Sequence, residues 1–260
     1  MGAHVDQLDP IAEARLRGAQ LSQFFLGDPQ SWKGPVVAYA GGAAAFRADA
    51  EAAGVALYVH APYVLNLATL NNRIRIPSRK LLQQTVTAAA SIGAKAVIVH
   101  GGHVGADDDP RIGFDNWRKA VDGLRMDCPI LIENTAGGTN AMARHLERID
   151  QLWTAISSAA GADRVGFCLD TCHAHAGGEE LIGLVERVRA ITGRIDLIHA
   201  NDSRDAFDSG ADRHANLGKG MADPAGIAAV VRDAGVPVVV ETPGSAAGHI
   251  ADLAWLRAAL

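Results

Sequence analysis

The sequence predicts an α/β protein folded as a single TIM barrel, with eight parallel strands inside a ring of helices. Eight short apolar segments have the character of strands, and segments of helical period lie between them. Strands that are apolar throughout, such as VIV at 97–99, are typical of a parallel sheet covered on both faces. No linker or low-complexity stretch divides the chain, so one domain is expected over residues 1–260. A doubly wound open sheet is the alternative.

The elements follow one another in regular alternation. The predicted strands are residues 2–5, 21–26, 56–60, 96–100, 129–134, 165–170, 195–201 and 236–241. Between some of them, residues 79–92, 141–156, 181–191 and 227–234 place apolar side chains three and four positions apart, as amphipathic helices do. Gly54, Gly93, Gly193 and Gly235 follow predicted helix ends, where left-handed C-caps favour glycine.

Composition and charge exclude several classes of protein. Hydrophobic residues make up 48% of the chain and charged residues 20%, so a full core is expected rather than disorder. No apolar run reaches the ~18 residues of a membrane span, and the N-terminal residues lack the pattern of a secretory signal. Three cysteines do not form a disulfide framework, so the expected location is the cytoplasm. The formal net charge of −5 argues against a general nucleic-acid coat.

Six consecutive predicted strands finish with a histidine or a carboxylate. These residues are His60, His100, Glu133, Asp170, His199 and Glu241. Barrel enzymes build their sites where the carboxyl ends of the strands converge, so we expect the six side chains to meet. Buried carboxylates are costly without cations, which favours a metal site over a structural explanation.

Three further residues extend this set. His173 lies three residues past Asp170, and Asp212 and His214 lie two apart in a later loop. Nine candidates exceed the four ligands of one Zn²⁺, so two or three ions are expected. Imidazole and carboxylate ligands suit Zn²⁺, with Mn²⁺ or Fe²⁺ as alternatives at the more oxygen-rich position.

Taken together, the motifs around these residues resemble the endonuclease IV family of metal-dependent abasic-site endonucleases, within the xylose isomerase-like TIM barrel superfamily. The resemblance runs through HAPY at 60–63, VHGGH at 99–103, ENTAG at 133–137, CLDTCH at 168–173, HANDS at 199–203, DRH at 212–214 and ET at 241–242. It implies a monomeric DNA repair enzyme that cleaves the phosphodiester bond 5′ to abasic sites in duplex DNA. The products implied are a 3′-hydroxyl and a 5′-deoxyribose phosphate.

The resemblance also implies three metal ions held by nine residues. Glu133 is the expected catalytic residue and bridges two ions. His60 and His100 complete the first ion, and Asp170, His199 and Glu241 complete the second. His173, Asp212 and His214 hold the third. Such sites activate water and neutralise the charge that develops on a phosphate.

Damaged duplex DNA is the expected partner. Tyr63 and Val64 resemble the family's wedge that enters the DNA from the minor groove. Arg73, Arg213 and Lys219 are candidate phosphate contacts. Gln30 occupies a position where many family members carry a DNA-inserting arginine, and it supplies neither a charge nor a guanidinium plane.

Two other functions fit parts of the pattern. A sugar isomerase or epimerase of the related barrels needs essentially one ion, held by Glu133, Asp170, His199 and Glu241. A non-catalytic protein that binds damaged DNA or zinc is the other alternative. Outside the site, His145 and His249 are expected on helices with their side chains in solvent.

Overall fold

The computed structural model describes all 260 residues, and its strands close into a parallel barrel. The barrel strands are β1 (Gly2–His4), β2 (Leu21–Phe25), β3 (Ala56–His60), β4 (Ala96–His100), β5 (Ile130–Glu133), β6 (Val165–Asp170), β7 (Leu197–His199) and β10 (Val238–Val240). They are hydrogen-bonded in the order β1-β10-β7-β6-β5-β4-β3-β2, and β1 also pairs with β2 and completes the ring. All eight predicted strands are confirmed: three have the predicted bounds, and the ends of the other five differ by no more than two residues.

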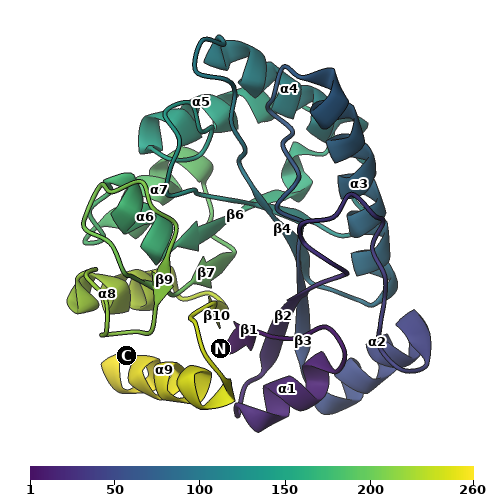
Figure 1. Cartoon of the computed structure of the whole chain (residues 1–260), viewed down its shortest axis with the longest axis vertical. Coiled ribbons are helices and arrows are strands. Elements are labelled where there is room, and N and C mark those ends of the chain that lie inside the picture. The colour runs from purple at the N-terminus through teal and green to yellow at the C-terminus, as the bar shows by residue number, and fades with distance from the viewer.

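Helices surround the strands (Figure 1). They are α1 (Pro10–Leu16), α2 (Gly42–Ala53), α3 (Asn72–Ser91), α4 (Pro110–Gly123), α5 (Leu146–Ile156), α6 (Thr171–Gly177), α7 (Leu184–Thr192), α8 (Pro224–Ala234) and α9 (Ala246–Ala259), with a short 3-10 turn at Ala162–Arg164. Asp9, Asp109 and Asp223 each precede a proline and cap the first turn of α1, α4 and α8. None of these helices has the length and apolar character needed to cross a membrane.

Several features differ from the predicted elements; α3, for example, begins at Asn72 and not at residue 79. The predicted helix at 141–156 begins only at Leu146, because Ala141 forms a β-bridge with His103 and the Met142 amide donates to the Gly102 carbonyl at 2.9 Å. Ala141, Met142 and Ala143 are therefore buried as part of a loop and not on the face of a helix. A short antiparallel hairpin of β8 (Asp202–Ser203) and β9 (His214–Ala215) was not expected either.

The barrel interior fixes the level at which polar side chains meet. It is filled by apolar side chains from the strands, including Leu21, Ile98 and Leu197, so it is a packed core rather than a pore. Above this core the strand register places His100 opposite Glu133 and Asp170 opposite His199. Chemistry-bearing residues from neighbouring strands are thus brought to the same height at the carboxyl rim.

His249 corrects one expectation. It lies on α9, but it is buried, with 6% of its surface exposed. Its Nδ1 accepts a hydrogen bond from Arg17 Nε at 3.0 Å, so the proton sits on Nε2, which donates to the Thr242 carbonyl at 2.9 Å. Burial, with the Arg17 charge, lowers its pKa and keeps the ring neutral. Arg17, whose hydrogen bond holds the buried His249 ring, lies 232 residues away in the sequence.

Replacing His249 with leucine is expected to lower the free energy of unfolding by about 2 kcal/mol, because the buried Arg17 loses an acceptor for its charged side chain. The matched control is His145→Leu, at an exposed position with no side-chain capping bond, which should change stability by no more than about 0.5 kcal/mol. Urea unfolding of both variants measures the difference. Equal effects would show that His249 has no special structural role.

Candidate metal centre

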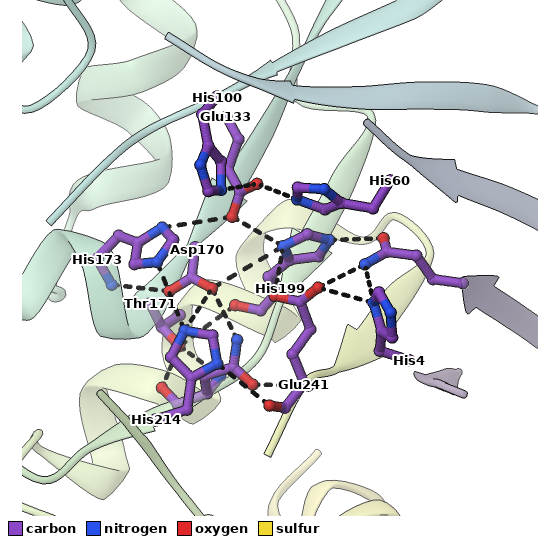
Figure 2. A network of polar contacts seen from close by, with 12 residues as sticks. His4, His60, His100, Glu133, Asp170, Thr171, His173, His199, His214 and Glu241 are labelled. Atoms are coloured by element: carbon purple, nitrogen blue, oxygen red, sulfur yellow. Dashed lines mark hydrogen bonds and ion pairs between the residues drawn. The ribbon is translucent and has the colours of Figure 1, made fainter. Parts of the chain in front are cut away.

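The nine predicted ligand residues meet at the carboxyl end of the barrel. The strand ends supply His60, His100, Glu133, Asp170 and His199. Glu241 is the first residue after β10, His173 lies in α6, His214 begins β9 and Asp212 lies just before it. Figure 2 shows all of them except Asp212 converging on a common centre. Their potential ligand atoms form three groups, each compact enough to surround one ion, and a fourth group combines Asp170 and His214 with Cys172.

The first group consists of His60, His100 and Glu133. The Nε2 atoms of the two histidines lie 3.2 Å and 3.3 Å from Glu133 Oε2. The other oxygen, Oε1, lies 2.9 Å from His199 Nδ1 and 3.3 Å from His173 Nδ1. Glu133 is fully buried, and its two oxygens face different sets of histidines. This is the arrangement that a bridging carboxylate requires.

The second group consists of Glu133, Asp170, His199 and Glu241. His199 Nδ1 lies 3.2 Å from Glu241 Oε2 and 3.9 Å from Asp170 Oδ2. Gln23 donates from Nε2 to Glu241 Oε1 at 2.5 Å. Asn201 donates to Asp170 Oδ2 at 2.7 Å. The carboxylates are therefore held in place by one amide side chain from the middle of β2 and one from just after β7.

The third group consists of His173, Asp212 and His214. Asp212 Oδ1 lies 3.0 Å from His173 Nε2 and 3.3 Å from His214 Nε2. Asp170 is the N-cap of α6, and its Oδ1 accepts a hydrogen bond from the His173 amide at 2.7 Å. The DTCH sequence thus positions a residue of the second group and one of the third in a single helical turn.

The ring nitrogens of the buried histidines indicate what the cluster binds. His60 Nδ1 lies 2.8 Å from the Ala61 carbonyl oxygen, which can only accept, so Nδ1 carries the proton. The pKa of His60 is lowered by burial, which leaves Nε2 with a lone pair facing the Glu133 carboxylate. Two acceptors facing each other need a cation between them. His173, His199 and His214 show the same pattern. In each, one ring nitrogen is hydrogen-bonded to a carbonyl or amide oxygen, and the other ring nitrogen faces a carboxylate.

Without metal, protons would provide this positive charge. Burial disfavours the protonated form of His173 and of His214, but the nearby Asp170 and Asp212 carboxylates outweigh this effect. The net result is a raised pKa for both histidines, to about 9 for His214. Burial likewise opposes ionisation of Glu133, yet the His199 and His100 charges hold its pKa well below the usual value. Each group therefore favours negative carboxylates with a cation beside them. Imidazole and carboxylate donors with fixed tautomers fit Zn²⁺.

A cavity of about 440 Å³ opens onto the cluster. Besides candidate ligands, it is lined by Tyr63, Arg204, Arg213 and Pro243. The Tyr63 ring is 5.8 Å from that of His100 and nearly parallel to it, and the Tyr63 amide donates to the Pro29 carbonyl at 2.8 Å. This fixes the loop after β3 against the loop after β2. The cavity thus combines a charged floor with an aromatic wall.

The predicted DNA-contacting residues are only partly brought together. Tyr63 and Arg213 line the cavity, whereas Val64, Gln30, Arg73 and Lys219 do not. Tyr63, Gln30, Arg73 and Lys219 are exposed, and Val64 is partly buried against the core. Arg213 forms an ion pair with Asp205, which the sequence did not predict.

Several residues that shape the site were missed from the sequence. Gln23 and Asn201 hold candidate ligands, and Arg204 lines the cavity. Asn201 lies just after β7, so the rule that picked out histidines and carboxylates would have found it had amides been included, whereas Gln23 lies in the middle of β2 and carries no strand-end signal. Arg204 carries no such signal, because its place depends on the β8–β9 hairpin.

The same whole-chain pattern appears in relatives. The sequence model of the family described as "Xylose isomerase-like TIM barrel" matches residues 11–259. The "Probable endonuclease 4" of Mycobacterium marinum (strain ATCC BAA-535 / M) is 54% identical over 260 residues, covering 99% of this chain and 97% of the relative. The protein of the same name in Mycobacterium leprae (strain TN) is 52% identical with the same coverage.

Solved structures agree with the observed fold. Endonuclease IV from Thermus thermophilus has a TM-score of 0.85 and 27% identity, covering 99% of this chain and 97% of that one. A D-tagatose 3-epimerase-like protein has a TM-score of 0.78 at 17% identity, covering 100% of this chain and 97% of that one. The second similarity indicates a shared barrel only.

Proposed function

Because the chain belongs to the xylose isomerase-like TIM barrel family and, within it, to the endonuclease IV enzymes, we propose that it cleaves duplex DNA on the 5′ side of abasic sites. The reaction is a hydrolysis that leaves a 3′-hydroxyl and a 5′-deoxyribose phosphate. The observation that carries the proposal is the presence of three ligand groups, two of which share Glu133.

We assign one ion to each group. His60, His100 and Glu133 would hold the first, and Glu133, Asp170, His199 and Glu241 the second. His173, Asp212 and His214 would hold the third. Zn²⁺ suits all three groups, and Mn²⁺ or Fe²⁺ also fits the second, which has three carboxylates. When bound, the ions supply an activated water and positive charge for the phosphate oxygens.

The chain's own residues organise this chemistry. Glu133 keeps the first two groups in register because its two oxygens face both of them. Gln23 and Asn201 orient Glu241 and Asp170, and carbonyl oxygens fix the tautomers of His60 and His173. The site is therefore assembled before substrate arrives, which reduces reorganisation during the reaction.

Selection of damaged DNA rests on the cavity beside the cluster. An abasic nucleotide has no base to unstack, so rotating it out of the helix costs less than for an intact one. Tyr63, exposed at the cavity edge, and the adjoining Val64 would fill the space left in the duplex. Arg73, Lys219 and Arg213 would contact phosphates, with Gln30 in a nearby exposed loop as a polar contact.

Two alternative functions make different predictions. A single-metal isomerase would use only the second group and would leave the other two without a role. A non-catalytic zinc or DNA-binding protein would have no need for ligands arranged around a shared carboxylate. Turnover of damaged DNA separates both from the proposed function.

The direct test incubates the purified protein with a duplex that carries one tetrahydrofuran abasic analogue and a 5′ label. We expect cleavage immediately 5′ to the analogue, giving a 3′ end that a polymerase extends without further processing. An undamaged duplex of the same sequence is the control and should remain intact. Absence of cleavage by the zinc-loaded protein would contradict the proposed function.

A further inference from the structure

Two arginines face the cavity from the β8–β9 connection. Arg204 follows β8, and Arg213 precedes His214 at the start of β9. The Arg204 amide donates to the Arg213 carbonyl at 3.0 Å, so the two residues lie directly across the hairpin from each other. They nevertheless have different electrostatic surroundings.

Arg213 is already neutralised within the protein. Its Nε donates to Asp205 Oδ2 at 2.8 Å, and its Nη2 donates to Asp205 Oδ1. These hydrogen bonds lower the pKa of Asp205, as expected for a bidentate ion pair. A phosphate that approached Arg213 would have to compete with this carboxylate.

Arg204 has no such partner. Its Nε donates to the His214 carbonyl at 3.0 Å, which fixes one edge of the guanidinium group. Its two terminal nitrogens make no hydrogen bond within the protein and the side chain forms no ion pair, although its charge adds to that of Arg213 in lowering the pKa of Asp205. The result is an oriented, unpaired positive charge at the wall of a cavity whose other walls include Asp212 and Glu241.

We infer that Arg204 binds a backbone phosphate of the cleaved DNA strand through its two terminal nitrogens, and that it is the main protein cation of the cavity. The inference rests on the proposed function. A guanidinium group held at Nε presents a rigid pair of donors that matches two phosphate oxygens. This protein charge would add to the positive charge that the proposed metal ions supply for the phosphate oxygens. Because Arg204 Nε is hydrogen-bonded to the backbone carbonyl of His214, a phosphate bound by Arg204 would lie at a fixed position relative to the third ligand group.

The test measures kcat/KM for the abasic duplex between about 50 and 200 mM KCl. We expect Arg204→Gln to lower kcat/KM about tenfold, chiefly through KM, and to reduce the slope of log(kcat/KM) against log[KCl] by about one. Arg204→Lys should keep the slope while losing part of the affinity, because it retains the charge without the fork. Arg213→Gln should have a smaller effect, because its charge is paired. Arg232→Gln, at an exposed ion pair on α8, controls for loss of a distant positive charge.

A second measurement identifies the phosphate and excludes indirect effects. Duplexes that each carry one neutral methylphosphonate are cleaved by the wild-type protein and by Arg204→Gln. At one position the methylphosphonate should slow cleavage by the wild-type protein about tenfold. The same methylphosphonate should slow cleavage by Arg204→Gln little, because this variant has already lost the contact. If the loss from the methylphosphonate and the loss from Arg204→Gln add at every position, and the wild-type protein is active, the phosphate contact of Arg204 is overturned and the proposed function is not. An inactive wild-type protein would instead overturn the proposed function.

Discussion

Replacing Glu133 with glutamine is expected to lower cleavage of abasic DNA at least about 1,000-fold, since a metal ion contributes several kcal/mol of transition-state stabilisation. Glutamine keeps the shape of the side chain, but it offers one oxygen and an amide group that is only a donor. It therefore cannot serve both the His60–His100 side and the His199 side of Glu133. Single-turnover cleavage and the zinc content of the variant are the measurements.

The matched control for this change is Glu51→Gln. Glu51 lies near the C-terminal end of α2, which leads into the start of β3, so it is at the opposite end of the barrel from the cluster. The same chemical change there should leave cleavage within about twofold, because the Arg47–Glu51 pair is exposed. Near-normal cleavage by Glu133→Gln with a full complement of zinc would contradict the bridging role of this residue.

Removal of metal should abolish cleavage and lower the melting temperature. Ions present at about 1,000 times their Kd stabilise a folded protein by about 4 kcal/mol per site. For a chain of this size, one such site corresponds to roughly 10 °C. Dialysis against a chelator followed by thermal unfolding measures the loss, and addition of Zn²⁺ should restore both properties. A chelated protein with unchanged activity and unchanged melting temperature would rule out structural and catalytic metal.

The metal-free protein should also respond to pH in a defined direction. The pKa of His214 is raised to about 9 and that of His173 lies well above its ordinary value of 6.5, so their protons stabilise the folded state fully below pH 6.5. That contribution is lost as the pH rises through the folded-state pKa values. Stability of the metal-free protein should therefore fall between about pH 7 and pH 9, whereas bound zinc should remove this dependence. Urea unfolding of both forms across this range makes the comparison.

Much of the barrel follows directly from local sequence, because each strand is a short apolar run that ends in a polar residue. His60, His100 and Glu133 could be placed at the rim for this reason alone, and the strand register brings them to one level. The division of the nine candidate ligand residues into three groups was implied by the family resemblance and not by the spacing of the residues. Spacing is insufficient because the order of residues along the chain does not say which oxygen of Glu133 faces which histidine.

The features that the sequence did not predict depend on long-range partners. The segment before α5 has a helical pattern, but pairing of Ala141 with His103 overrides it. His249 is buried because Arg17, near the other end of the chain, needs an acceptor. The difference between Arg204 and Arg213 arises from the single carboxylate of Asp205, which reaches only one of them as an ion pair.

The central claim is that side chains from six strand ends, helix α6 and the start of the β9 strand hold three cations, two of which share the Glu133 carboxylate. Elemental analysis of the purified, zinc-saturated protein tests this most directly, with protein concentration determined independently. We predict three transition-metal ions per chain. A saturated protein that retains at most one ion would contradict the claim and would favour the single-metal barrel enzymes instead.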